Sequence, residues 1–168
     1  VSITTWCIGQ KAYIFGGRNG GLLDCNELWE YDMSSHLWTW LGGQDTNANY
    51  SYGTKGVASA QNWPRENINS NSKWVRGNTF YLFGGGHLDL STYTTYLHND
   101  IWSYNCTTKL WTWLGGDSSI NSNGHYSSSQ CVDTVGLSPK ARANGNSAIA
   151  GVCNNSNWYY SGVSDYDS

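Results

Sequence analysis

Residues 37–43 read LWTWLGG, and residues 110–116 repeat the same seven letters. A heptapeptide with two tryptophans does not recur by chance in a chain of 168 residues, so the sequence contains an internal repeat. Side chains alternate between the two faces of a β-strand, which places both tryptophans on one face and both leucines on the other. Both faces are therefore largely apolar, as expected for a sheet packed between two similar sheets.

The repeat extends well beyond the heptapeptide. WCIGQKAYIFGG (6–17) aligns without gaps to WVRGNTFYLFGG (74–85), and NELWEYDMSSHLWTWLGG (26–43) aligns to NDIWSYNCTTKLWTWLGG (99–116). The second copy is longer only between the glycine pair and the strand that follows, where a connecting loop tolerates a change of length. The apolar runs and polar turns of each copy predict four strands.

A third copy begins near the end of the sequence. PKARANGNSAIAGVCNNSNWYYSGV (139–163) parallels PRENINSNSKWVRGNTFYLFGG (64–85), with Pro139 aligned to Pro64. The glycine pair of this copy reads Gly162-Val163, and the sequence ends before any counterpart of NELWEYD. The predicted organisation is a first unit at 3–43, an insertion at 44–70, a second unit at 71–116, an insertion at 117–141 and half of a third unit at 142–168.

A double glycine that ends an apolar strand, then a tyrosine, then a tryptophan seven residues later, resembles the Kelch repeat. The long link between the copies is similar to that of galactose-oxidase-like, long-blade Kelch repeats. The resemblance implies an all-β protein, a segment of a β-propeller built from four-stranded antiparallel blades. The residues that carry it are Gly16, Gly17, Tyr31 and Trp38 in the first copy and Gly84, Gly85, Tyr104 and Trp111 in the second.

These motif residues have structural roles in the predicted blade. The glycines permit positive φ or the close approach of another backbone. We expect Trp38 and Trp111 each to bury about 150–250 Å² against a neighbouring blade.

A propeller closes with roughly 4–8 blades, more than this sequence supplies. The chain is therefore expected to be an excerpt of a longer polypeptide, or several copies assemble, as in an extracellular fibre or scaffold. The excerpt is favoured, because joining copies head to tail leaves the third blade without its outer half. The expected partners are further blades of the same longer chain or of other copies.

Composition narrows the class of protein. The net charge is −3 with no basic stripe, so nucleic acid is not expected as a partner. Aromatic residues make up 15% and charged residues 12% of the chain, which with 20 glycines favours β-structure with frequent turns. No segment approaches the ~18 continuous apolar residues of a membrane span. The sequence shows no signal peptide and does not begin with Met, so a mature form or an excerpt is expected.

Cysteines and glycosylation sequons together favour an extracellular, glycosylated protein. The sequons begin at Asn49, Asn105 and Asn154. Two disulfides are expected, with one cysteine left over, whereas buried thiols in a cytosolic protein are the alternative. The candidates for disulfides are Cys7, Cys25, Cys106, Cys131 and Cys153.

The sequence contains no recognisable catalytic motif. Neither a Ser–His–Asp order, nor a carboxylate pair, nor a phosphate-binding glycine loop is present, so we expect no catalytic residue, cofactor or metal. Of His36, His87, His98 and His125, the middle two flank a long loop, and ligands at its opposite ends are not expected to converge on a metal.

Propellers usually bind through loops at one end of the ring. The candidate loops are 18–25, 44–63, 86–98 and 117–138, and the third carries Tyr93 and Tyr96 among serines and threonines, which suits contact with protein or sugar. The sequence thus favours a non-enzymatic binding or structural module of a secreted glycoprotein. The alternatives are part of a secreted copper-radical oxidase acting on carbohydrate, which the resemblance allows, and an intracellular Kelch adaptor.

Overall fold

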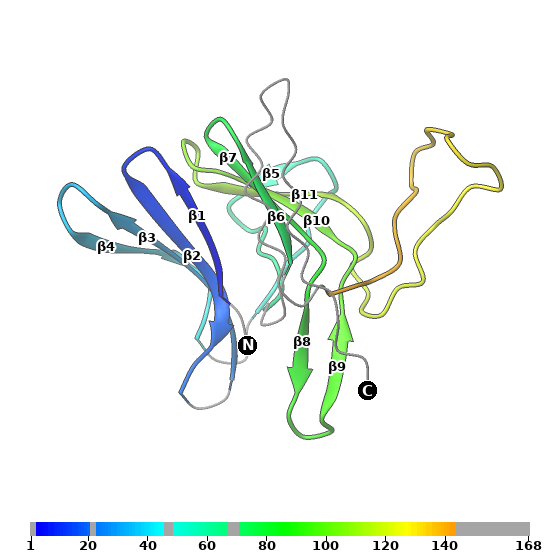
Figure 1. Ribbon diagram of the computed structural model, residues 1–168, viewed down its shortest axis with the longest axis horizontal. Helices are drawn as coiled ribbons and strands as arrows, with labels where there is room; N and C mark the ends of the chain where they lie inside the picture. Colours follow the sequence, from blue (N-terminus) through cyan, green and yellow to red (C-terminus); the bar gives the residue numbers. More distant parts are fainter. Residues whose placement is uncertain (1–2, 21–22, 46–48, 67–70, 144–168) are drawn as a thin grey trace, which may run out of the picture.

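The computed structural model describes residues 3–20, 23–45, 49–66 and 71–143. These residues form two antiparallel sheets that lie side by side, with a separate hairpin below the second (Figure 1). Within this part of the chain there is no helix long and apolar enough to cross a membrane. Most of the predicted third unit, from residue 144 onward, lies outside the described residues. The all-β fold with four-stranded antiparallel blades is confirmed, and the described residues do not close a ring.

The first sheet, blade 1, has the order β1-β2-β3-β4. A turn of four residues joins the last two strands, and within it Asp32 Oδ1 accepts hydrogen bonds from the backbone N–H groups of Ser34 and Ser35. This Asx turn explains why a short polar connection suffices between two apolar strands. The strands are β1 (Thr4–Ile8), β2 (Lys11–Arg18), β3 (Asp24–Asp32) and β4 (Leu37–Gly42).

The second sheet, blade 2, repeats this order and adds a fifth strand. Its four repeated strands are β6 (Ser72–Arg76), β7 (Thr79–Phe83), β10 (Ile101–Asn105) and β11 (Leu110–Gly115). The fifth strand, β5 (Ala58–Ser59), comes from the insertion at 44–70 and pairs with β11 at the sheet edge.

The strand from the insertion is added to the four strands expected in this blade, and its neighbours explain its presence. An edge strand leaves backbone groups unpaired. Asn62 Nδ2 donates to the carbonyl of Trp111, and the N–H of Gly56 donates to the carbonyl of Trp113. The insertion therefore covers the outer edge of β11.

The loop predicted at 86–98 is a β-hairpin. Its strands are β8 (Gly86–Asp89) and β9 (Thr94–Leu97), and the hairpin extends away from the two sheets (Figure 1). The register pairs Gly86 with Leu97 and His87 with Tyr96. The extra residues of the second copy are therefore ordered by pairing with each other.

The core lies between the two blades. Each blade has two faces, which we call face A and face B. Face A carries Tyr31 and Trp38 in blade 1 and the aligned Tyr104 and Trp111 in blade 2. Face B carries the aligned sets Trp6, Tyr13, Phe15 and Leu28 in blade 1 and Trp74, Tyr81, Phe83 and Ile101 in blade 2.

Face B of blade 1 packs against face A of blade 2. Trp6 stacks on Phe80 with ring centroids 3.7 Å apart, and Phe15 lies 5.3 Å from Trp111. The two motif glycine pairs lie at the ends of β2 and β7 with φ between 66° and 101°. Gly84 is one site where this freedom is required, because a Cβ there would lie 2.7 Å from the carbonyl oxygen of Arg142.

A buried asparagine organises the chain at the start of the third strand of each repeat. Asn26 accepts a hydrogen bond from the N–H of Gln44 and donates to the carbonyl of Pro64. The asparagine thus ties the end of one blade to the link that leads to the next. Asn99 repeats both contacts, with the N–H of Asp117 and the carbonyl of Pro139.

Candidate functional site

Face A of blade 1 is an exposed aromatic surface. Trp38 is 52% exposed and Trp40 is 57% exposed, and the indole of Trp38 contacts Tyr31 at 4.8 Å and Trp29 at 6.4 Å between ring centroids. The expected burial of Trp38 against a neighbouring blade is therefore not found in the described chain. Trp38 stays exposed because it lies on face A, whereas blade 2 covers face B of blade 1.

The same motif in blade 2 is buried. Trp111 is 1% exposed and is surrounded by rings that include Phe15 of blade 1 and Trp63 of the insertion. The two copies of LWTWLGG thus have the same strand geometry and opposite environments.

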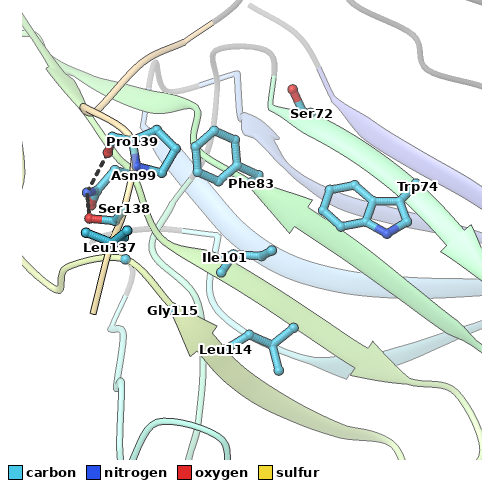
Figure 2. A pocket seen from close by; sticks show the side chains of 11 residues that line it. Ser72, Trp74, Phe83, Asn99, Ile101, Leu114, Gly115, Leu137, Ser138 and Pro139 are labelled. Atoms are coloured by element: carbon cyan, nitrogen blue, oxygen red, sulfur yellow. Dashed lines mark hydrogen bonds between the residues drawn. The ribbon is translucent and has the colours of Figure 1, made fainter. Parts of the chain in front are cut away.

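Face B of blade 2 carries an open hollow of about 470 Å³. Figure 2 shows Trp74, Phe83 and Ile101 on one side of this hollow and Pro139 beside Phe83. The lining is mainly apolar, and Leu114 and Leu137 complete it. On blade 1 the corresponding surface is covered by blade 2, so the hollow lies where a further blade would pack.

The β8–β9 hairpin presents a second candidate surface. Tyr93 lies at its tip, 81% exposed, with a positive φ of 53°. Tyr96 lies on β9, where its ring is partly buried and lies 5.1 Å from that of His87. Of the two tyrosines predicted to bind, Tyr93 is the one that is freely accessible.

The base of the hairpin is held by contacts to both blades. The N–H of Leu88 donates to Asp24 Oδ2 of blade 1, and Asp24 forms an ion pair with Arg18 at 2.7 Å. On the blade 2 side, the N–H of His98 donates to the carbonyl of Gly85. The tip is therefore presented on a fixed base.

The hairpin also brings together two histidines that the sequence places eleven residues apart. His87 Nδ1 and His98 Nε2 are 3.1 Å apart, and Glu66 Oε1 lies 3.7 Å from the same His87 nitrogen. The two ends of this loop lie together because β8 and β9 pair in register. Among the described residues, no group of three or more His, Cys, Asp and Glu side chains is placed to hold a metal ion.

Burial determines the protonation of this histidine pair. It lowers the pKa of His98 to about 3, with a further contribution from the neighbouring His87. Burial also lowers the pKa of His87, and the carboxylate of Glu66 partly opposes that change. Both rings are therefore neutral at pH 7, and one ring nitrogen donates a hydrogen bond to the other. The remaining histidines have local partners, since His36 hydrogen-bonds Tyr31 and His125 contacts Asp117.

A buried carboxylate joins the insertion to blade 2. Asp100 accepts hydrogen bonds from the hydroxyl of Tyr52 and from Nε1 of Trp102. Burial raises the pKa of Asp100, and these two donors oppose the rise. The carboxylate has structural partners on both sides, which accounts for its place in the core.

The four described candidates for disulfides are free thiols. Cys7 and Cys131 are exposed, Cys25 is buried and Cys106 is half-buried, and in this part of the chain no two are joined. Burial raises the pKa of the Cys25 and Cys106 thiols, which reduces their reactivity. The fifth candidate, Cys153, lies outside the described residues.

The sequon asparagines have different surroundings. Asn49 is exposed on the link after blade 1. Asn105 is half-buried, and its Oδ1 accepts hydrogen bonds from the N–H groups of Thr107 and Thr108. It thus forms in blade 2 the same kind of Asx turn that Asp32 forms in blade 1. Asn154 lies outside the described residues.

Sequence reasoning missed Asn26 and Asn99. Both are aligned and fully buried, and an asparagine that recurs at the start of an apolar strand in two copies was the available signal. A buried amide must satisfy several hydrogen bonds, so its recurrence in a repeat marks a structural anchor.

Comparison with known proteins agrees with this arrangement. Residues 2–45, which contain all of blade 1, match the family model of the Kelch motif. A search of curated proteins finds no match. Kelch repeats are generally non-catalytic and form β-propeller modules that bind proteins. Residues 2–45 therefore carry a Kelch motif that forms blade 1, and blade 2 repeats the strand order of that blade.

Proposed function

We propose that this chain is a non-enzymatic binding module that recognises a protein partner through the tip of the β8–β9 hairpin. The observation that supports this most directly is the 81% exposure of Tyr93 at the end of a hairpin anchored to both blades. An exposed tyrosine offers apolar contact area and a hydroxyl at low cost in conformational entropy. The partner is expected to offer a shallow apolar pocket with a hydrogen-bonding group at its end.

A matched pair of variants tests this proposal. The wild-type chain captures its partner from the native source, and dissociation constants are then measured with purified partner for Tyr93→Ala and Tyr126→Ala. Tyr126 is 68% exposed on the separate segment after blade 2. An interface tyrosine at a hot spot contributes at least about 2 kcal/mol, so Tyr93→Ala should weaken binding about 30-fold and Tyr126→Ala should not. Equal affinities of the two variants would refute the assignment to the hairpin.

We further propose that the protein is secreted and glycosylated. Asn49 supports this because it lies in a sequon on an exposed link. The intact mass of the native protein before and after treatment with peptide:N-glycosidase tests it, with Asn49→Gln as the matched variant. Unmodified Asn49, Asn105 and Asn154 would count against secretion.

An intracellular Kelch adaptor is the second candidate. The four free thiols, including buried Cys25, favour it. Titration of thiols in the native, unreduced protein separates the two candidates, because a secreted protein with disulfides would show fewer reactive groups after denaturation. The copper-radical oxidase stays a prediction, which titration of the chain with copper and an assay on carbohydrate would test.

The two uncovered faces support a larger propeller. Face A of blade 1 carries the tyrosine and tryptophan that are buried at the aligned positions of blade 2, and face B of blade 2 carries the tryptophan, tyrosine and phenylalanine that are buried at the aligned positions of blade 1. Further blades, from the same longer chain or from other copies, would cover them. The intact mass of the native polypeptide and its sedimentation in solution distinguish these sources.

A further inference from the structure

We propose that the His87–His98 pair is a pH-sensitive switch, which holds the β8–β9 hairpin against the blades at neutral pH and releases it in mildly acidic surroundings. The switch concerns the position of the whole hairpin and does not depend on the partner that Tyr93 contacts. Three features carry it, namely the way the hairpin joins the blades, the geometry of the two rings and the charges around them.

The hairpin is a separate two-stranded sheet inserted between β7 and β10 of blade 2 (Figure 1). Within the described residues β8 and β9 pair only with each other, whereas β7 and β10 pair directly, with Ile101 opposite Phe83. Three consecutive glycines, 84–86, lead into the hairpin, and the first two have positive φ. The hairpin can therefore swing about its base while the strand pairing of both blades stays intact.

The histidine pair is covered while the hairpin lies on the blades. The N–H of Leu88 donates to Asp24 Oδ2 of blade 1 at 3.0 Å, and the N–H of Leu97 donates to Asn121 Oδ1 of the segment after blade 2 at 2.8 Å. With these contacts made, His98 is only 3% exposed. Water reaches its ring freely only when the hairpin moves away.

The two facing ring nitrogens can share one hydrogen but not two. His87 Nδ1 lies 3.1 Å from His98 Nε2, so one of these nitrogens donates and the other accepts. A single added proton leaves this hydrogen bond in place, whereas protonation of both rings puts an N–H on each facing nitrogen. Two imidazolium ions at this distance also repel each other. The doubly protonated pair therefore requires the rings to separate.

Charged groups on the insertion and on blade 1 act on the pair. Arg65 of the insertion disfavours a positive charge on either ring. Its neighbour Glu66 favours a charge on His87, since Glu66 Oε1 lies 3.7 Å from Nδ1 of that ring. Asp24 of blade 1 acts in the same direction, but Arg18 already neutralises it in an ion pair at 2.7 Å. Glu66 is thus the main group that opposes release.

The charged groups on the hairpin and on blade 2 have partners of their own. Asp89 of the hairpin accepts a hydrogen bond from the turn that follows it, and Asp100 of blade 2 accepts two inside the core. Arg142 donates its backbone N–H to the carbonyl of His98, while its guanidinium donates to a carbonyl of its own segment. Glu66 Oε2 is buried with no hydrogen-bond partner among the described residues. One carboxylate is therefore available for a first proton on the pair, and none that we describe for a second.

Acid consequently favours the open hairpin. In the open form both rings reach water, and each binds a proton below about pH 6.5. In the closed form burial lowers the pKa of both rings, that of His98 to about 3. From pH 7 to pH 5 the equilibrium constant for opening should rise roughly 25-fold for one histidine that stays neutral in the closed form, and at most about 600-fold for two.

Amide hydrogen exchange in the full chain tests the switch, with each rate divided by that of an unstructured chain at the same pH. The reporters are the N–H groups of Leu88 and Leu97, because their acceptors lie outside the hairpin. We expect protection of both to fall by roughly 25-fold to 600-fold from pH 7 to pH 5. It should also stay well below that of β10 and β11, because the hairpin opens while blade 2 remains folded.

Variants that cannot titrate in this range identify the groups responsible. The glutamine side chain donates and accepts hydrogen bonds without titrating, so His87→Gln/His98→Gln should abolish the pH dependence. His36→Gln, in an exposed turn of blade 1, is the matched control and should leave it unchanged. A pH dependence that persists in the double variant would overturn the proposal and assign the effect to other groups.

The wild-type measurements decide the matter even if the double variant fails to fold. Protection of Leu88 and Leu97 that is the same at pH 7 and pH 5 would overturn the switch. Protection equal to that of β10 and β11 would overturn it too, because the hairpin would then open only when the whole chain unfolds.

Discussion

The two copies of LWTWLGG place the same tryptophan in two environments, so substituting each one measures how much packing contributes to the free energy of unfolding. Trp38 and Trp111 occupy the same position in the same heptapeptide, on the last strand of each blade. We predict that Trp111→Ala lowers the free energy of unfolding more than Trp38→Ala does. The heptapeptide is the same for both, so the difference reports tertiary packing, to which blade 1 and the insertion both contribute at Trp111.

The magnitude follows from the neighbours of each ring. Trp111 has five aromatic rings with centroids between 5.0 and 6.3 Å away, whereas Trp38 has two, Tyr31 and Trp29, both on its own blade. Truncating a fully buried tryptophan costs about 3–5 kcal/mol. Trp38 keeps half of its surface in water and so buries about half of the ~150–250 Å² of a tryptophan. At about 25 cal/mol per Å² of buried area, its loss amounts to roughly 2–3 kcal/mol as an upper bound.

Urea-induced unfolding followed by far-UV circular dichroism measures both losses, since fluorescence itself changes when a tryptophan is removed. Trp111→Phe is the control for total loss of structure. It keeps a ring in the core and removes the indole Nε1, which is buried without a hydrogen-bond partner. Its cost should be clearly smaller than that of Trp111→Ala. Equal losses for Trp38→Ala and Trp111→Ala would refute the reasoning, because they would place both rings in similar environments.

Three further predictions concern the anchors and the histidine pair. Asn99→Ala should lower the free energy of unfolding by about 1–3 kcal/mol for each buried backbone group left unpaired, measured by urea unfolding, and an unchanged midpoint would contradict its role as an anchor. Gly116→Ala should destabilise more than Gly77→Ala, because a Cβ at Gly116 would lie 2.1 Å from the carbonyl oxygen of Asn99 whereas at Gly77 nothing lies within 4 Å; both have positive φ, so equal losses would exclude a steric cause. The unfolded chain binds a proton at His98 below about pH 6.5, whereas the folded chain binds it only near pH 3. The free energy of unfolding therefore decreases as the pH is lowered through this window, by at most about 1.4 kcal/mol per pH unit. His98→Gln should flatten this dependence in unfolding measured from pH 7 to pH 4.

Much of each blade is predictable from sequence because its causes are local. Alternating apolar residues in LWTWL and the short polar turns specify strands and their connections. The glycine pairs at Gly16-Gly17 and Gly84-Gly85 have the positive φ that their place at a strand end suggests. The hairpin at 86–98 was not predicted, since its Ser/Thr-rich centre has no strong turn signal, and neither was the strand at Ala58–Ser59, which forms by covering an edge.

The sequence by itself determined that the chain is all-β, that it is repeated, and that each repeat is a blade with two apolar faces. Only the tertiary structure decided which faces are covered. Trp38 and Trp111 have identical flanking letters, yet blade 1 lies over the second and nothing described lies over the first. In the same way, pairing of β8 with β9 brings His87 to His98, and folding brings Asn99 to Pro139. Strand formation depends on near neighbours in the chain, whereas burial depends on segments far apart in sequence, so identical heptapeptides reach different environments.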